Sequence, residues 1–415
     1  MKQYDTYKDS GVQWLGEIPG HWEMSKISSH FRQRNEKVSD KDYPALSVSK
    51  QGVTPQLDNV ALSNAEGTSR KLAKVGDYAV NSRSDRKGSC GVSKYEGSVS
   101  LITIVLEPFN INGEYVHYLF RSNPWVEEFY RNGRGIVADL WTTNYQMMKS
   151  MYMPVPPLSE QRSIVSFLDA KCGKIDEWVT KKQKEVEHLQ ELKQRVIADA
   201  VTRGLNPHVK MKATNIPWIK EIPEHWDCAK LKMFCQDNKE KNKGNIESCV
   251  LSLSYGNIIV KKNINFGLVP ENYESYQIVN PGNIILRLTD LQNDHKSLRT
   301  GLVKNRGIIT SAYVGLIVKN MNSEYTQLIL HSYDVMKVFY GMGGGLRQSM
   351  SYTDIANVYI PVPPLSEQKQ IVSYLDAKCA KIDKLITNIT KEIERIKEYK
   401  QRLISDVVTG QIKVC

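Results

Sequence analysis

The chain contains one phrase of 23 residues twice. "PVPPLSEQRSIVSFLDAKCGKID" begins at Pro154, and "PVPPLSEQKQIVSYLDAKCAKID" begins 207 positions later at Pro361, with 19 of the 23 letters identical. A second match lies upstream of each copy, where "WLGEIPGHWEMSK" from Trp14 resembles "WIKEIPEHWDCAK" from Trp218. Such repetition indicates that one structural unit occurs twice, and it limits the possible folds more than any other feature of the chain.

The repeated phrases surround two long stretches whose letters barely agree. Each copy consists of an opening phrase, a variable stretch, the Pro-rich phrase and a charged helical tail. We call the repeated parts the frame. The predicted segments are an N-terminal frame segment at 1–22, a variable domain at 23–153, a central frame region at 154–215, a second variable domain at 216–360 and a distal frame region at 361–415. A shared frame around two different inserts suggests one architecture that serves two specificities.

The variable domains are predicted to be mixed α/β. Strand-like runs include "SVSLITIVLEP" at 98–108 and "GIITSAYVGLIV" at 307–318, and turn phrases such as "PGNI" lead into other strands. The expected fold class is therefore α+β, with two such domains related by a pseudo-two-fold internal repeat.

Each helical tail carries a narrow apolar seam. We expect Ser159 and Ser366 to act as N-caps and a weak break to follow near "CGK" and "CAK". Spacing that alternates between three and four residues is typical of coiled coils, so we predict a long antiparallel helix pair that separates the domains. The alternative, in which each helix lies on its own domain, stays open. The seam residues are Ile175, Val179, Val186, Leu189, Val196 and Ala200 in the first copy, and Ile382, Ile386, Ile389, Ile393, Ile396, Leu403 and Val407 in the second, with Lys182, Lys193 and Lys400 as interruptions.

Composition favours a polyanionic partner. The formal net charge is +11 and the pI is near 9.1, which indicates nucleic acid more readily than any other partner, although a basic protein with a solvated surface has the same composition. The sequence contains no run of 18 apolar residues, so no membrane span is expected. The seven scattered cysteines suggest a reducing, cytoplasmic compartment.

Polar, basic loops in the variable domains are the candidate nucleic-acid contacts. They include "NSRSDRKGSCG" at 81–91, "RLTDLQNDHKSLRTG" at 287–301, and the stretches that precede each Pro-rich phrase. Arginine, lysine and glutamine can contact base edges or phosphates, but any one of them could instead be a solvated surface side chain. The candidates are Lys50, Arg83, Arg86, Lys87, Arg134, Arg287, Arg299, Lys304, Arg306, Arg347 and Gln348.

The motifs of common catalytic sites are missing from the sequence. It has no phosphate-binding lysine loop, no Asn/Asp-Pro-Pro-aromatic loop for adenine methylation, no histidine metal cluster and no nucleophile elbow. We therefore expect a binding protein with no catalytic residue, cofactor or metal of its own. His21 and His225 recur beside Trp22 and Trp226, which suggests a packed structural pair.

The repeated "PVPPLSEQ…I…LD…KID", the "EIPEHW"-type openings and the two dissimilar domains resemble the specificity subunit of type I restriction–modification enzymes. The resemblance implies two target-recognition domains that read a bipartite site in double-stranded DNA. It also implies partners: two methyltransferase subunits that use S-adenosylmethionine, and restriction/translocase subunits that use ATP and Mg²⁺.

We further expect the chain start, with Trp14 and Trp22, to pack near its end. The alternatives are a stand-alone basic repeat scaffold or RNA-binding protein, and a self-sufficient DNA-modifying enzyme.

Overall fold

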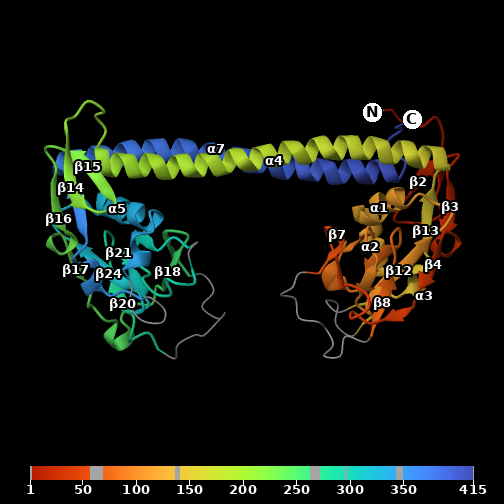
Figure 1. Cartoon of the computed structure of the whole chain (residues 1–415), viewed down its shortest axis with the longest axis horizontal. Helices are drawn as coiled ribbons and strands as arrows, with labels where there is room; N and C mark the ends of the chain where they lie inside the picture. Colours follow the sequence, from red (N-terminus) through yellow and green to blue (C-terminus); the bar gives the residue numbers. More distant parts are fainter. Residues whose placement is uncertain are drawn as a thin grey trace. The chain divides into compact units, whose positions relative to one another are not determined.

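The computed structural model describes residues 2–56, 69–135, 141–261, 272–294, 297–342 and 349–414. The chain forms two compact units (Figure 1). Unit 1 comprises Met1–Gln183 and Lys391–Cys415, and unit 2 comprises Lys184–Thr390. Each unit thus contains one variable domain, part of the helix that follows it and part of the helix from the other copy.

Unit 1 is built on a four-stranded antiparallel sheet with the order β10-β9-β12-β4. Its other strands form the sheet β11-β8-β5 and the pairs β1-β2, β3-β13 and β6-β7. The strands are β1 (Tyr7–Asp9), β2 (Glu17–Pro19), β3 (Glu23–Lys26), β4 (Phe31–Arg34), β5 (Lys37–Val38), β6 (Leu46–Ser49), β7 (Gly52–Pro55), β8 (Arg70–Ala73), β9 (Tyr78–Asn81), β10 (Cys90–Val92), β11 (Gly97–Val99), β12 (Thr103–Pro108) and β13 (Tyr152–Val155). The short helices are η1 (Ile27–Ser29), η2 (Ser84–Arg86), α1 (Gly113–Arg121), α2 (Asn123–Arg131) and α3 (Tyr145–Met148).

Unit 2 has a four-stranded sheet with the order β22-β21-β24-β17, which matches the sheet of unit 1 strand for strand. The pairs β14-β15, β16-β25, β18-β19 and β20-β23 complete it. The strands are β14 (Met211–Ile216), β15 (Ile219–Pro223), β16 (Asp227–Lys230), β17 (Cys235–Asp237), β18 (Leu251–Ser254), β19 (Asn257–Val260), β20 (Gln277–Val279), β21 (Ile284–Leu286), β22 (Thr300–Leu302), β23 (Gly307–Ile309), β24 (Val314–Val318) and β25 (Tyr359–Val362). The short helices are η4 (Leu231–Met233), η5 (Lys243–Asn245), α5 (Ser323–Val335), η6 (Val338–Gly341) and α6 (Tyr352–Ile355). The mixed α/β prediction is confirmed, and the variable stretches share a topology despite their different letters.

The two frame tails form long helices, α4 (Leu158–Arg203) and α7 (Leu365–Val408). The expected break near "CGK" and "CAK" is wrong, because both helices continue through it; a glycine such as Gly173 disfavours a helix by only about 1 kcal/mol. The expected N-caps are wrong by two positions. The carbonyl of Pro157 accepts the Gln161 amide at 2.9 Å, so Pro157 holds the cap position and Ser159 lies inside the first turn.

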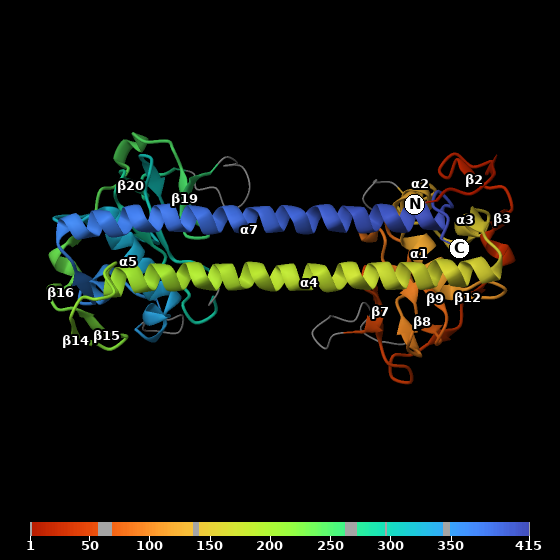
Figure 2. The same cartoon turned by 90° about the horizontal axis from the view of Figure 1, so that it is seen from above.

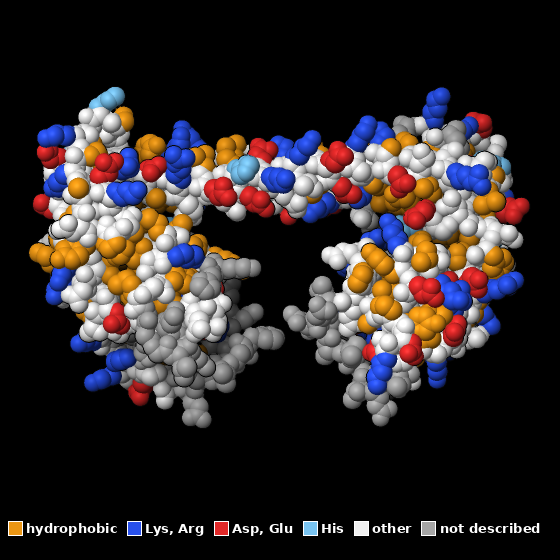
Figure 3. All heavy atoms as spheres, in the orientation of Figure 1, with side chains coloured by type: hydrophobic (Ala, Val, Ile, Leu, Met, Phe, Trp, Pro, Cys, Tyr) orange, Lys and Arg blue, Asp and Glu red, His pale blue; other side chains and the backbone are white. Residues whose placement is uncertain are grey.

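Burial along α4 and α7 follows the positions predicted for the apolar seam. Every predicted seam residue is buried or half-buried. Within unit 1, Lys400 of α7 contacts Asp176 of α4 at 2.7 Å, and within unit 2, Lys193 of α4 contacts Asp383 of α7 at 2.7 Å. Figure 2 shows the two helices side by side within each unit, and Figure 3 shows basic and acidic side chains mixed along their exposed surface.

The last turn of each long helix packs into the unit that holds the other copy of the frame. In unit 1, the Tyr115 hydroxyl donates to the carbonyls of Pro154 (3.0 Å) and Val408 (3.3 Å). In unit 2, the Tyr325 hydroxyl donates to the carbonyl of Val201 at 3.0 Å and also to that of Pro361. The core of each unit therefore includes residues from both frame copies.

The glutamine of the phrase "PPLSEQ" ties the start of each long helix to the variable domain. Gln161 is buried, accepts the Asn112 amide at 2.9 Å and donates to the Pro156 carbonyl at 2.8 Å. Gln368 accepts the Asn322 amide at 2.8 Å and makes the same bond to its own proline. Both asparagines are the N-caps of a helix in the variable domain, α1 or α5.

The glutamate of the same phrase ties the helix start to the opening phrase. His21 Nε2 lies 2.7 Å from Glu160 Oε2, and His225 Nε2 lies 2.9 Å from the equivalent Glu367. The neighbouring Trp22 and Trp226 are fully buried. The tryptophans are packed as expected, whereas His21 and His225 are exposed side chains that contact the glutamate. Both copies of the phrase make the same contact.

The beginning and the end of the chain pack together in unit 1, as expected. The Lys413 amide donates to the Lys2 carbonyl at 2.9 Å, and the Tyr7 hydroxyl donates to the Gly410 carbonyl at 3.2 Å. Gly410 has a φ of 79°, and a Cβ there would lie 2.2 Å from the Pro19 ring, so glycine permits this close approach. Among the described helices, none is long and apolar enough to cross a membrane.

Candidate nucleic-acid interface

The candidate loop of unit 1 connects two neighbouring strands of the main sheet, β9 and β10. Helix η2 lies in this loop and brings three candidates close together. Asp85 lies between two of them, 3.1 Å from Arg83 Nε and 3.7 Å from Arg86 Nε. The Arg86 side chain is 67% exposed, so this ion pair leaves it accessible to a further anion.

Arg134 joins this cluster through the backbone. Thr142 pairs in antiparallel bridges with both Arg83 and Arg134, so these two arginines flank a single residue. Arg134 is exposed. The structure therefore brings together basic residues from two stretches that lie about fifty positions apart in the sequence.

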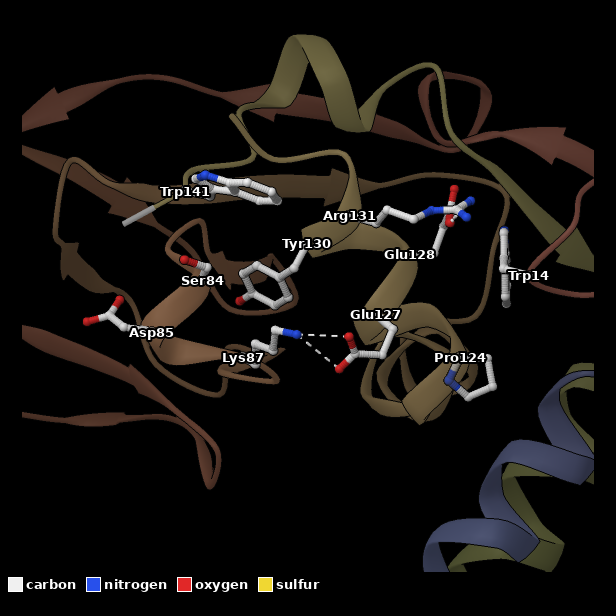
Figure 4. A pocket seen from close by; sticks show the side chains of 10 residues that line it. All are labelled: Trp14, Ser84, Asp85, Lys87, Pro124, Glu127, Glu128, Tyr130, Arg131 and Trp141. Carbon is white, nitrogen blue, oxygen red and sulfur yellow. Dashed lines mark hydrogen bonds and ion pairs between the residues drawn. The ribbon is translucent and has the colours of Figure 1, made fainter. Parts of the chain in front are cut away.

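A pocket of 670 Å³ lies beside this cluster (Figure 4). Lys87 projects toward Glu127 of α2, and its ammonium lies 2.8 Å from a carboxylate oxygen. Arg131 is paired with Glu128 at 2.6 Å. The lining is Trp14, Ser84, Asp85, Lys87, Pro124, Glu127, Glu128, Tyr130, Arg131 and Trp141.

The pocket itself is poorly suited to a phosphate. Its two bases are paired with two carboxylates, and Asp85 adds a third acid. Like charge repels an anion, so the accessible candidates for phosphate contact are the arginines beside the pocket. Trp141 also lines the pocket and is 36% exposed, beside Thr142. It lies in the stretch before the first Pro-rich phrase, but the sequence analysis names only Arg134 from that stretch as a candidate.

Lys50 lies at the tip of the β6-β7 hairpin and is exposed. Its carbonyl accepts a hydrogen bond from Arg121 of α1. Lys50, Lys87 and Arg121 all line a second pocket of 640 Å³ that also includes Lys400. The hairpin tip and the β9-β10 loop thus contribute basic side chains to one region of unit 1.

Unit 2 has its candidate loop at the equivalent connection, between β21 and β22. Here the prediction for Arg299 is wrong as a direct contact, because its side chain is 0% exposed. Its guanidinium donates to the carbonyls of Arg287 at 3.1 Å and Thr289 at 2.8 Å, and also to those of Asp290 and Asp294. The residue holds the loop together from inside.

Further contacts fix Arg299 in place. Its Nε donates to the Tyr340 hydroxyl at 3.0 Å, and its guanidinium lies 5.2 Å from the centre of that ring. Its amide donates to Asp334 at 2.6 Å. Burial raises the pKa of Asp334, although the Arg299 amide opposes this shift. Arg287, on the same loop, is 33% exposed and lies 3.6 Å from Asp294.

Lys304 and Arg306 lie between β22 and β23, and both are exposed. Arg306 donates to Asn280 at 2.7 Å and to Glu247 at 3.2 Å. The amide of Cys249 is the largest contribution that lowers the pKa of Glu247, and Arg306 adds to it. Arg306 is 50% exposed, so it keeps a free surface. Arg347 and Gln348 lie outside the described residues.

Among the described residues, no group of three or more His, Cys, Asp or Glu side chains is arranged to hold a metal ion. The six described cysteines are free thiols. Each unit therefore presents exposed basic side chains on several loops, which lie between β9 and β10 and at the β6-β7 tip in unit 1, and between β22 and β23 in unit 2. Such side chains can contact phosphates and base edges.

Comparisons with known proteins all identify similarity to proteins of type I restriction–modification systems. Residues 223–395 match the type I restriction modification DNA specificity domain. The chain is 25% identical to the putative type I restriction enzyme MjaX specificity subunit of Methanocaldococcus jannaschii, over 96% of each chain. It is also 25% identical to the MjaVIII specificity subunit of the same organism, over 96% of this chain and 94% of that one. A chain in a solved structure of the type I R-M system, on its complex assembly and conformational transition, has a similar fold, with a TM-score of 0.67. The two chains are 15% identical, and the alignment covers 95% of this chain and 99% of that chain.

Proposed function

We propose that the chain is a specificity subunit of the type I restriction–modification family and that it reads a bipartite site in double-stranded DNA, with one half of the site for each variable domain. The observation that carries the proposal is the repetition of one topology with different exposed loops. The strand orders β10-β9-β12-β4 and β22-β21-β24-β17 are equivalent, whereas the basic loops on them differ in sequence. Two copies of one scaffold with different reading loops suit two unrelated half-sites.

The long helices are proposed to form an antiparallel coiled coil that connects the two recognition domains, 23–153 and 216–360. The 3–4 spacing of the buried seam supports this arrangement, as do the equivalent ion pairs Lys400–Asp176 and Lys193–Asp383. The frame segments 1–22, 154–215 and 361–415 belong to this connecting part.

We propose that the frame docks two methyltransferase subunits and that restriction/translocase subunits join them. The repeat carries identical side chains that remain largely exposed in both copies, and a surface shared by both copies supports a shared partner. Leu158 and Leu365 are 48% and 51% exposed, and Tyr152 and Tyr359 are 41% and 43% exposed. Lys26 and Lys230 each lie 5.7 Å from the ring of the adjacent tyrosine. Two equivalent surfaces suit two copies of one partner.

In this proposal the chain is a non-catalytic recognition subunit of an adenine-specific methyltransferase and type I deoxyribonuclease complex. S-adenosylmethionine, ATP and Mg²⁺ belong to the partner subunits, and the complex acts in the cytoplasm. A stand-alone basic scaffold or RNA-binding protein is the alternative, and the net charge of +11 fits it equally well.

Domain exchange tests the proposal. The chain is produced in cells with its methyltransferase, and methylated adenines are mapped across the genome. Replacing residues 23–153 with the equivalent domain of a relative should change one half of the methylated sequence, and replacing 216–360 should change the other half. A change in both halves after either exchange would contradict the proposal, as would adenine methylation by the purified chain alone.

A further inference from the structure

The β18-β19 hairpin of unit 2 ends in an unusual turn. Ser254 pairs with Asn257, so Tyr255 and Gly256 form a two-residue loop. Their φ angles are 46° and 77°, both in the left-handed region, as a type I′ turn requires. Such turns favour Asn-Gly, because an aromatic side chain crowds the backbone at positive φ. Tyr255 is therefore held in a conformation that its side chain disfavours.

The Tyr255 side chain makes few packing contacts that would compensate for this strained backbone conformation. It is 88% exposed, more than any other exposed large hydrophobic residue among the described part of the chain. On the adjoining strand β19, Ile259 and Val260 are 48% and 46% exposed. A strained, projecting aromatic residue that packs against nothing suggests a contact with another molecule.

The hairpin is seated firmly on the candidate loop of unit 2. A Cβ at Gly256 would lie 3.2 Å from Leu298, next to the buried Arg299. A Cβ at Gly301 would lie 2.7 Å from Leu253 and 2.9 Å from Ile258, so the inner face of the hairpin lies directly on β22. The tip therefore projects from a rigid base beside the loop that carries Arg287.

The equivalent hairpin of unit 1 differs in chemistry but not in position. β6 and β7 pair with Ser49 opposite Gly52, which leaves Lys50 and Gln51 at the tip. Both of these residues are exposed. One tip is thus basic and polar, the other aromatic, and both kinds of side chain contact DNA in groove-binding proteins. A tip that binds a shared protein partner would instead be expected to match between the units.

We propose that the β18-β19 hairpin enters a groove of the DNA and that the ring of Tyr255 contacts a base step of the half-site read by unit 2. This inference rests on the proposed function. The major groove is wide enough for a two-stranded β-ribbon. The turn holds an 88% exposed ring at the tip of a hairpin that is packed on β22, so that the base contact is organised before DNA binds.

Tyr255→Asn tests the inference, because it removes the ring and also suits the turn. The full chain is purified with its methyltransferase, and the probe is a duplex that carries the site mapped from wild-type methylation. We expect affinity for this duplex to fall by about 10- to 100-fold, the loss expected for one good base contact. The melting temperature should stay equal or rise, since asparagine adopts positive φ more readily. A merely structural role for Tyr255 would instead lower it.

Two further variants sharpen the result. Tyr255→Phe keeps the ring and should retain most of the affinity. Tyr95→Asn makes the same exchange at an exposed turn of unit 1, where Tyr95 is 44% exposed, and should leave affinity unchanged. The loss in Tyr255→Asn should disappear when the half-site of unit 2 is scrambled in the probe.

Several outcomes would overturn the assignment. Unchanged affinity in Tyr255→Asn, or an equal loss on cognate and scrambled probes, would remove Tyr255 from the specificity-determining residues. Loss of the methyltransferase during purification, with DNA affinity retained, would show that the hairpin docks a protein. If the wild-type complex binds the cognate and scrambled probes equally well, the proposed function is wrong. If the wild-type complex prefers the cognate probe and Tyr255→Asn binds it with the same affinity, only the role of Tyr255 is wrong.

Discussion

Lys193 and Asp383 face each other across the long helices of unit 2, with Nζ and Oδ1 2.7 Å apart. In the repeat, Lys193 corresponds to Lys400 and Asp383 to Asp176, and these two residues form the same contact at 2.7 Å in unit 1. Both lysines interrupt the apolar seam of their own helix. Each interruption is thus matched by an aspartate on the facing helix, which favours one register of the pair.

The first prediction concerns these interruptions. Changing Lys193 and Lys400 to leucine should raise the melting temperature, because two of the three interruptions of the apolar seam become apolar. Asp383→Ala should lower the free energy of unfolding by less than about 1 kcal/mol, because the Asp383 side chain is 53% exposed and water screens the ion pair. Thermal denaturation measures both effects. Lys181→Leu, at an exposed position outside the seam, is the control, and an equal gain there would contradict the seam explanation.

The seam and the repeat could be predicted because both are visible in the letters alone. Helical periodicity identified the buried positions of α4 and α7, and internal comparison identified the frame. The unbroken path of α4 through Gly173 could not be predicted, since the packed seam on both sides outweighs a weak local preference. The cap position was missed because the carbonyl of Pro157 accepts the first helical bond, which no side-chain pattern indicates.

The candidate interface was predictable by region but not by residue. The loops at 81–91 and 287–301 do lie at equivalent connections of the two sheets. Arg299 and Arg306 are the same letter in the same basic region, yet one is fully buried and the other half-exposed. The difference in exposure between the two arginines depends on the path of the loop, because several of its carbonyls point inward and accept hydrogen bonds from Arg299. Likewise, the letters "SYGN" do not reveal that Tyr255 projects at positive φ.

The second prediction is that the frame glutamines contribute equally to the two units. Gln161→Leu removes the partner of the Asn112 amide and of the Pro156 carbonyl, and a buried unpaired group costs about 1–3 kcal/mol. Gln368→Leu should destabilise unit 2 to the same extent. Hydrogen exchange measured separately for peptides of each unit should show faster exchange only in the altered unit. Arg162→Leu, at an exposed neighbouring position, should change neither unit.

The third prediction is a loss of stability in weak acid. Burial, followed by the charge of Lys193, lowers the pKa of His331 to about 4. In the unfolded chain a histidine has a pKa near 6.5, so the unfolded state takes up a proton first as the pH falls. This contribution to stability is complete above pH 6.5 and is lost progressively between about pH 6.5 and pH 4.

His331→Gln should reduce this pH dependence while keeping a polar partner for Gln194, which lies 3.0 Å from His331. The measurement is the melting temperature of unit 2 between pH 7 and pH 4.5. Buried His117 of unit 1 also has a pKa lowered to about 4, so part of the dependence should remain. Exposed His208→Gln is the control. A wild-type melting temperature that stays constant over this range would contradict the prediction.

The fourth prediction separates base contacts from phosphate contacts among the exposed arginines. Alanine at a base contact should cost about 1–3 kcal/mol of discrimination at one position of the site. Alanine at a phosphate contact should weaken all sequences alike and lower the salt slope by about one. Arg83 and Arg134 should affect only the half-site of unit 1, and Arg306 only that of unit 2. Binding titrations at several salt concentrations decide the class of each residue, and unchanged binding in all three variants would remove them from the interface.

The last prediction assigns Arg299 to the fold of unit 2. Arg299→Ala leaves the carbonyls of Arg287 and Thr289 without this donor and removes one of the cations that contact the Tyr340 ring. Removing one side of a buried charged network costs about 3–5 kcal/mol, so the melting temperature of unit 2 should fall clearly while unit 1 keeps its own. Arg306→Ala should cost less than about 1 kcal/mol, because that side chain is 50% exposed. Thermal unfolding together with hydrogen exchange over residues 284–302 makes the comparison. If Arg299→Ala melts like the wild type yet loses recognition of one half-site, the guanidinium must leave the loop to contact DNA, and its structural assignment is wrong.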